Sequence, residues 1–315
     1  DDKKPIWAAA RTRLMEAIRE VLGEAGAPPL PEPLAGSIVD SHTHLDTVQD
    51  VVGIEPAISL AAAREVGVTR IAQIGCDVAG SEFAEELART HKNVIAAVAI
   101  HPNDAARLGR EKIGDALKRI DELASVGNHV RAIGETGIDH FGTTDADGQA
   151  LQREVFAAHI AMAHAHDLTL AIHMRDARNG GEGDEPPSGR QAHDDVVDVL
   201  NSEGWPDRII MHCYSGDADL ARICLDHGAY LSFSGTITFN SAGPQRDALA
   251  IAPDNRILVE TDAPFLTPAP RRGKRNGPYL LPHTARFIAK QRGWDELRVC
   301  QQLTENAFAA YGGAW

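Results

Sequence analysis

The stretch IVDSHTHLD, residues 38–46, places His42 and His44 two positions apart behind a short apolar run. Side chains two positions apart in a β-strand point to the same face of the sheet, so both imidazoles would face the same way. Histidine is the commonest metal ligand, and the pair therefore favours a metal site. A polar strand edge would have the same spacing, so the choice between these interpretations depends on partners elsewhere in the chain.

The elements that would carry these histidines recur along the chain. Segments with apolar residues at three-to-four spacing alternate with short apolar runs rich in β-branched residues, which lie at 37–44, 70–76, 94–102, 131–137, 169–173, 208–213, 229–235 and 256–262. Strand alternating with helix eight times predicts the α/β class and a (β/α)8, or TIM-type, barrel. The length of 315 residues suits one such barrel.

Residues of ligand type cluster at the carboxyl ends of the expected strands, where such a barrel builds its active site. They are His42, His44, His101, Glu135, His173, His212 and Asp262. Even without His101, the set has four imidazoles and two carboxylates, more than one tetrahedral ion needs. It matches a two-metal hydrolase site bridged by Glu135, because the strand ends offer no lysine. The two expected ions are Mg²⁺, Mn²⁺ or Zn²⁺, and their expected ligands are His42, His44, Glu135, His173, His212 and Asp262.

The composition predicts a globular protein that does not enter a membrane. The chain is 43% hydrophobic, and no apolar run approaches the roughly 20 residues that a membrane helix needs. Charges interrupt the apolar positions near the N-terminus, which argues against a secretory signal. Four cysteines without a C-x-x-C pair favour a reducing cytoplasm. Cys213 directly follows His212, so strand alternation predicts that its side chain points to the core.

The net charge of −14 excludes the broad basic surface with which a protein wraps duplex DNA. The end of a DNA strand needs a smaller positive surface than a wrapped duplex does. Two divalent ions would outweigh the two carboxylates of Glu135 and Asp262 and leave the metal centre positive. Beyond Asp262, four cations stand within five positions: Arg271, Arg272, Lys274 and Arg275. A solvated loop is one interpretation of this run, and a phosphate-binding segment is the other.

Residues 1–35 are predicted to form a helical extension and a linker, ahead of a barrel domain at 36–315. An amphipathic helix that ends near Gly23 is indicated by the helical spacing of Ile6, Ala10, Leu14, Ile18 and Leu22. The proline-rich APPLPEPLAG that follows predicts an extended linker. Farther along, residues 178–191 are rich in Gly, Pro and acidic residues, which predicts a disordered surface loop on the rim.

A series of sequence blocks resembles, in order, the signature blocks of TatD-type metal-dependent deoxyribonucleases. The blocks are SHTHLD, AIHP, IGETGID, IHMRDA, HCYSG and VETDAPFL, followed by RGKRNGPYLLPHT. The resemblance implies a TIM-type barrel that hydrolyses DNA phosphodiesters, mostly as a 3′ exonuclease, and leaves action at abasic sites open. The implied partner is a DNA end, single-stranded by preference, and we expect a monomer.

Carried over by position, the resemblance divides the ligands between two ions. His42, His44, Glu135 and Asp262 resemble the ligands of one metal, and Glu135, His173 and His212 resemble those of the second. Asp262 also resembles the residue that orients or deprotonates the attacking water, so Asp262 and Glu135 are the candidate catalytic residues. The candidates for holding substrate phosphates are His101, Arg175, Arg272, Lys274 and Arg275.

Fold and metals alone do not choose a substrate. The alternative is a metal-dependent hydrolase of another bond, such as an amide, a lactone or an aminoacyl-tRNA ester. A binding protein with a purely structural metal is disfavoured by the open rim and the bridging carboxylate.

Overall fold

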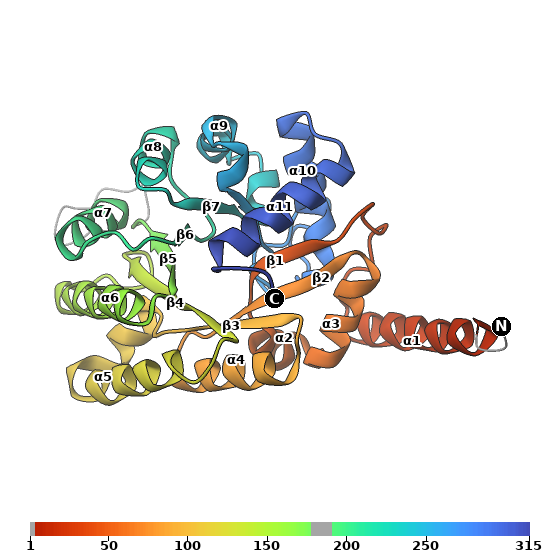
Figure 1. Cartoon of the computed structure of the whole chain (residues 1–315), viewed down its shortest axis with the longest axis horizontal. Coiled ribbons are helices and arrows are strands. Elements are labelled where there is room, and N and C mark those ends of the chain that lie inside the picture. Colours follow the sequence, from red (N-terminus) through yellow and green to blue (C-terminus); the bar gives the residue numbers. More distant parts are fainter. Residues whose placement is uncertain (1–3, 178–190) are drawn as a thin grey trace.

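The computed structural model describes residues 4–177 and 191–315 and contains one sheet of parallel strands in the order β1 to β8 (Figure 1). The strands are β1 Ile38–Thr43, β2 Val68–Ile74, β3 Val94–Val98, β4 Val130–Asp139, β5 Thr169–Arg175, β6 Ile209–Met211, β7 Tyr230–Phe233 and β8 Ile257–Val259. Two backbone hydrogen bonds join the segment after β8 to the end of β1. The N–H of Asp262 donates to His42 O (2.9 Å), and the N–H of His44 donates to Ala263 O (3.0 Å). The sheet therefore closes into the predicted TIM-type barrel.

Helices form the outer ring around this sheet (Figure 1). They are α2 Leu45–Val52, α3 Pro56–Glu65, α4 Val78–Thr90, α5 Pro102–Ala124, α6 Ala146–His166, α7 Ala192–Glu203, α8 Ala218–Asp226, α9 Gly243–Ile251, α10 Leu281–Arg292 and α11 Glu296–Ala310. Short 3₁₀ turns lie at η1 Gly235–Thr238, η2 Asp254–Arg256 and η3 Pro278–Leu280. The first helix, α1 Lys4–Glu24, instead projects away from the barrel (Figure 1).

Each predicted strand is confirmed, although the carboxyl ends of the strands differ from the expectation. β4 and β5 run farther than predicted because they stay paired up to Asp139 opposite Arg175. Glu135 and His173 therefore lie within their strands. β8 ends sooner, so Asp262 lies in the loop beyond it.

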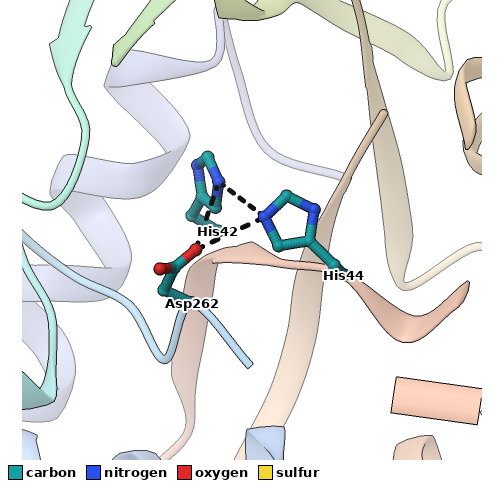
Figure 2. A group of neighbouring side chains, drawn as sticks. All are labelled: His42, His44 and Asp262. Atoms are coloured by element: carbon teal, nitrogen blue, oxygen red, sulfur yellow. Dashed lines mark hydrogen bonds and ion pairs between the residues drawn. The ribbon is translucent and has the colours of Figure 1, made fainter. Parts of the chain in front are cut away.

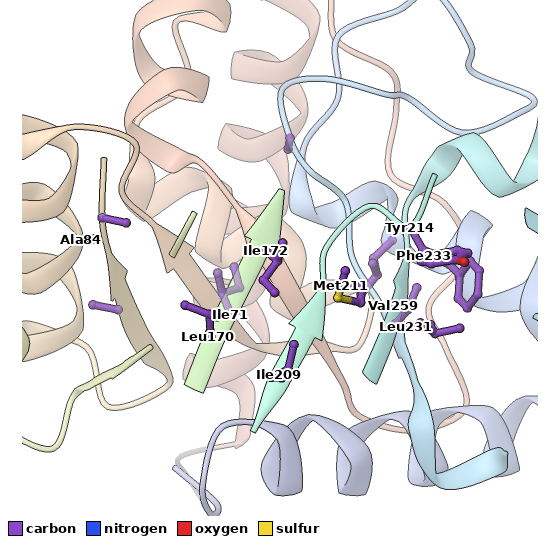
Figure 3. Close-up of a cluster of buried hydrophobic side chains, with 14 of the residues drawn as sticks. Ile71, Ala84, Leu170, Ile172, Ile209, Met211, Tyr214, Leu231, Phe233 and Val259 are labelled. Atoms are coloured by element: carbon purple, nitrogen blue, oxygen red, sulfur yellow. The ribbon is translucent and has the colours of Figure 1, made fainter. Parts of the chain in front are cut away.

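The strands divide their side chains between two apolar layers, as the pleat requires. Along β6, Ile209 and Met211 belong to the layer between sheet and helices, whereas Ile210 belongs to the barrel interior. Figure 3 shows the outer layer, where Met211 and Leu231 of neighbouring strands lie side by side. Ala307 and Ala310 of α11 pack with the interior residues. These packed layers hold the rim residues in fixed positions.

The N-terminal extension is helical as predicted and docks through the end of α1. Ile18 and Leu22 are buried, whereas Leu14 of the same stripe is 41% exposed. The proline-rich segment after α1 contains no helix or strand. It is held against the barrel, because the Tyr279 hydroxyl donates to Pro28 O (2.8 Å). The division into an extension at 1–35 and a barrel at 36–315 stays a prediction.

The loop predicted at 178–191 falls outside the described residues, apart from Gln191. Among the helices within 4–177 and 191–315, none has the length and apolar character that crossing a membrane requires.

Candidate metal centre

His42, His44 and Asp262 converge from the two segments that close the barrel (Figure 2). His42 lies in β1, and His44 directly precedes α2. Asp262 has a positive φ of 54°, and its backbone bond to His42 O holds the carboxylate beside both rings. The expectation that the two imidazoles face the same way is confirmed, because their Nε2 atoms lie 3.2 Å apart.

Glu135 places a carboxylate oxygen beside the two imidazole nitrogens that Asp262 also faces. Glu135 Oε2 lies 3.3 Å from His42 Nε2 and 3.5 Å from His44 Nε2. Asp262 Oδ1 lies 3.7 Å and 3.3 Å from the same two nitrogens. An ion with tetrahedral ligands at about 2.1 Å would separate those ligands by about 3.4 Å, which is close to the spacing found. The donor atoms of His42, His44 and Asp262 all lie within 4.8 Å of one another, so these three residues fit a divalent ion.

The other oxygen of Glu135 faces a different set of imidazoles. Glu135 Oε1 lies 2.8 Å from His173 Nδ1, 3.2 Å from His212 Nε2 and 3.6 Å from His101 Nε2. The donor atoms of His101, Glu135 and His173 all lie within 4.8 Å of one another. Glu135 thus presents one oxygen to each of two donor groups, which is the arrangement of a bridging carboxylate. His101, expected from the sequence to hold a phosphate, lies within the second group.

Two carboxylates that the sequence interpretation missed lie behind the histidines of the second group. Asp139 Oδ2 is 2.9 Å from His173 Nε2, and Glu260 Oε1 is 2.8 Å from His212 Nδ1. A metal-bound histidine usually gives its second nitrogen to a carboxylate or a carbonyl, which fixes the ring. Their positions in the sequence could have indicated them. Asp139 is the last residue of the IGETGID block, and Glu260 precedes Asp262 by two residues.

Both ligand carboxylates are held in the anionic form that metal binding requires. Burial alone would raise the pKa of Glu135, but His212 and the hydrogen bonds from His173 and His42 hold it well below its usual range. Burial also disfavours charge on Asp262, yet the hydrogen bond from His44 and the nearby imidazoles lower its pKa.

The imidazoles divide into neutral and protonated groups. Burial lowers the pKa of His42, and it lowers that of His101 to about 3. Burial opposes charge on His173 as well, but hydrogen bonds to Asp139 and Glu135 raise its pKa to about 9. A protonated imidazole cannot bind a metal, so metal binding here has to displace protons.

Residues of both donor groups line a pocket of about 800 Å³; they are His44, His101, Glu135, His173, His212 and Asp262. Arg175 also lines this pocket, and its guanidinium carbon lies 3.7 Å from the centre of the Phe141 ring, which holds the cation in place. Cys213 lines it too, so the expectation that Cys213 points to the core is wrong. The reason is that β6 ends at Met211 and Cys213 has a φ of 41°, so strand alternation does not reach it.

The basic residues beyond Asp262 lie at a second pocket, of about 670 Å³. Arg272, Lys274 and Arg275 line it, whereas Arg271 is not among its lining residues. Phe239 and Leu266 line both pockets, so the two pockets are adjacent. The structure therefore brings His101 and Arg175 to one pocket and the three other candidate phosphate-binding residues to its neighbour.

Comparison with known proteins places these features in a family. Residues 39–312 match the family model of the TatD related DNases. An uncharacterized metal-dependent hydrolase TatD from Mycobacterium tuberculosis is 39% identical over 283 residues, which cover 88% of this chain and 99% of that protein. The 3'-5' ssDNA/RNA exonuclease TatD of Enterobacter lignolyticus is 32% identical over 263 residues, covering 81% of this chain and 92% of that protein. The crystal structure of YJJV, a TatD homolog from Escherichia coli, has a TM-score of 0.73 at 24% identity and covers 88% of this chain and 98% of that one. This chain therefore belongs to the TatD family of metal-dependent hydrolases.

Proposed function

We propose that this hydrolase cleaves phosphodiester bonds at the 3′ end of single-stranded DNA, using water activated between two divalent ions. The observation that carries the proposal is the position of Glu135 in the pocket: its two carboxylate oxygens face separate donor groups. Divalent ions held by these residues would supply Lewis-acid chemistry, lowering the pKa of a shared water and stabilising the charge that develops on a phosphate.

Residues of the pocket supply the remaining functions of such a reaction. Asp262 lines the pocket as a carboxylate with a lowered pKa, so it is ionised near neutral pH and can accept a proton from the attacking water. Arg175, held against Phe141, places a fixed positive charge where a phosphate oxygen would lie. No side chain has to act as a covalent nucleophile.

Two observations favour single-stranded nucleic acid as the substrate: the name of a relative and the distribution of charge. The Enterobacter relative is named for exonuclease action on single-stranded DNA and RNA. The adjacent pocket with Arg272, Lys274 and Arg275 offers cations for neighbouring phosphates. The net charge of −14 opposes a wrapped duplex, so a chain end that enters a pocket is the favoured substrate.

An oligonucleotide labelled at its 5′ end tests the proposal directly. We expect stepwise shortening from the 3′ end with Mg²⁺, Mn²⁺ or Zn²⁺, and none after chelation. Glu135→Gln should abolish the ladder, whereas Glu154→Gln should not, because Glu154 forms an exposed pair with Arg110. Hydrolysis of a lactone, an amide or an aminoacyl ester without any cleavage of the oligonucleotide would contradict the proposal and support the alternative. A parallel oligoribonucleotide tests selectivity for the sugar.

A further inference from the structure

The second pocket lies between the N-terminal extension and the basic loop, and we call it the extension pocket. Ala25 and Gly26, directly after α1, form one of its walls. The cations of Arg272, Lys274 and Arg275 form another. An anion in this pocket would therefore contact residues from opposite ends of the chain.

Close contacts and hydrogen bonds hold the rim between the two pockets in place. A Cβ at Gly235 would lie 2.1 Å from Leu266 O, so the loop after β7 lies directly against the segment that carries Leu266. The N–H of Ala269 donates to Thr238 Oγ1 (2.9 Å). The backbone of the basic loop is held as well, because the Thr267 hydroxyl donates to Lys274 O (2.6 Å). A polynucleotide strand that crosses this rim would therefore contact a preformed surface.

The cations of the extension pocket have no acidic partner among residues 4–177 and 191–315. Arg272 instead lies over the Phe239 ring, with its guanidinium carbon 4.2 Å from the ring centre. By contrast, two other exposed arginines are paired with carboxylates: Arg110 with Glu154 and Arg119 with Glu82. Exposed cations that converge on one cavity without carboxylates favour an external anion as their partner.

The wall at Ala25 and Gly26 is not part of the matched family model, which begins at residue 39. It is nevertheless anchored to the barrel. Ile18 and Leu22, in the preceding turns of α1, are buried, and the hydroxyl of Tyr279 binds Pro28 O. The extension therefore adds a fixed wall to a pocket that already borders the metal centre.

We infer that the extension pocket is a second phosphate subsite, occupied by the part of a single-stranded polynucleotide on the 5′ side of a scissile phosphate that lies at the metal centre. The inference rests on the proposed function and specifies its substrate. Strands long enough to cross the rim at Phe239 gain contacts that a minimal ester lacks, and the N-terminal extension makes this chain sensitive to strand length.

Charge placed on the wall tests the subsite. Ala25→Lys should tighten, and Ala25→Glu should weaken, binding of a phosphorothioate-linked oligonucleotide of about eight nucleotides, each by about threefold to fivefold at low salt. The ratio between the two variants should grow with oligonucleotide length and shrink as salt is raised. Ala10→Lys and Ala10→Glu, on the exposed part of α1, serve as matched controls and should bind like the wild type.

The outcomes separate the two proposals. Opposite effects of the Ala25 variants cannot arise from a shared loss of folding, and thermal melting of each variant checks that loss independently. Equal affinity of Ala25→Lys and Ala25→Glu for the longer oligonucleotide, alongside normal cleavage by the wild type, would overturn the subsite and leave the proposed function intact. A wild type that neither binds nor cleaves the oligonucleotide would overturn both.

Discussion

Glu260→Gln should weaken metal binding at the histidine that Glu260 supports. Glu260 is 0% exposed, and its Oε1 lies 2.8 Å from His212 Nδ1. The same oxygen accepts the N–H of Cys213 (3.0 Å), and Oε2 accepts the hydroxyl of Ser232 (2.5 Å). Glutamine keeps the shape and an acceptor oxygen, so the substitution removes the charge while preserving most of the packing.

Two opposing effects decide how much affinity is lost. Burial opposes charge on His212, but Glu260 and Glu135 raise its pKa well above the usual range. Below that pKa, a proton and a metal compete for Nε2, and the loss of Glu260 weakens both. Above the pKa of His212, no proton competes for Nε2, so the variant shows the full loss of metal affinity. That loss is about 10-fold to 100-fold when the carboxylate behind a metal-bound histidine is removed. The deficit should therefore grow as the pH rises.

Calorimetric metal titrations between about pH 6 and about pH 9 measure this deficit across the range where histidines titrate. Glu154→Gln, which breaks an exposed pair with Arg110, is the matched control and should follow the wild type. Thermal melting of Glu260→Gln at each pH checks that the variant is folded under the titration conditions. Equal metal affinity of Glu260→Gln and wild type at the higher pH would refute the role assigned to this carboxylate.

Three further changes test the rest of the site. Glu135→Ala should lose both ions and turnover while the circular dichroism spectrum stays native, and full metal content with normal activity would rule out the bridge. Asp262→Asn loses the proton acceptor, so kcat should fall by about 100-fold or more, with metal content measured alongside. Replacing Arg272, Lys274 and Arg275 together by glutamine should reduce the log-log salt slope of oligonucleotide binding by roughly 0.7 for each lost phosphate contact. An unchanged slope would make the basic run a solvated loop.

The barrel and the ligand candidates could be predicted from the sequence because both depend on local patterns. Short β-branched runs alternating with helical periodicity specify strands and helices one at a time, and parallel strands bring their carboxyl ends to one rim. His42 and Asp262 lie far apart in the chain, but each follows its own apolar run. Their convergence is a consequence of the architecture.

Features that depend on distances between elements could not be predicted in this way. The place of His101 beside Glu135 follows from how the loop after β3 packs against β4. Cys213 turned into the pocket because its backbone left the strand region, which alternation does not foresee. The extension pocket joins residues 25–26 to residues 272–275, and no sequence pattern links two such distant segments.

The added carboxylates also change the charge balance at the metal centre. Two divalent ions would outweigh Glu135 and Asp262 alone, but Asp139 and Glu260 lie directly behind the second group and bring the count to four carboxylates. The metal-loaded centre is then close to neutral.

Attraction for a phosphate chain must come from cations nearby, and the cations of the adjacent extension pocket lack acidic partners among the described residues. Because salt screens charges beyond about 8 Å at physiological ionic strength, this local field outweighs the net charge of −14 spread over the whole molecule. On the proposed function, these local cations would let an acidic protein admit the end of a nucleic-acid strand at one place.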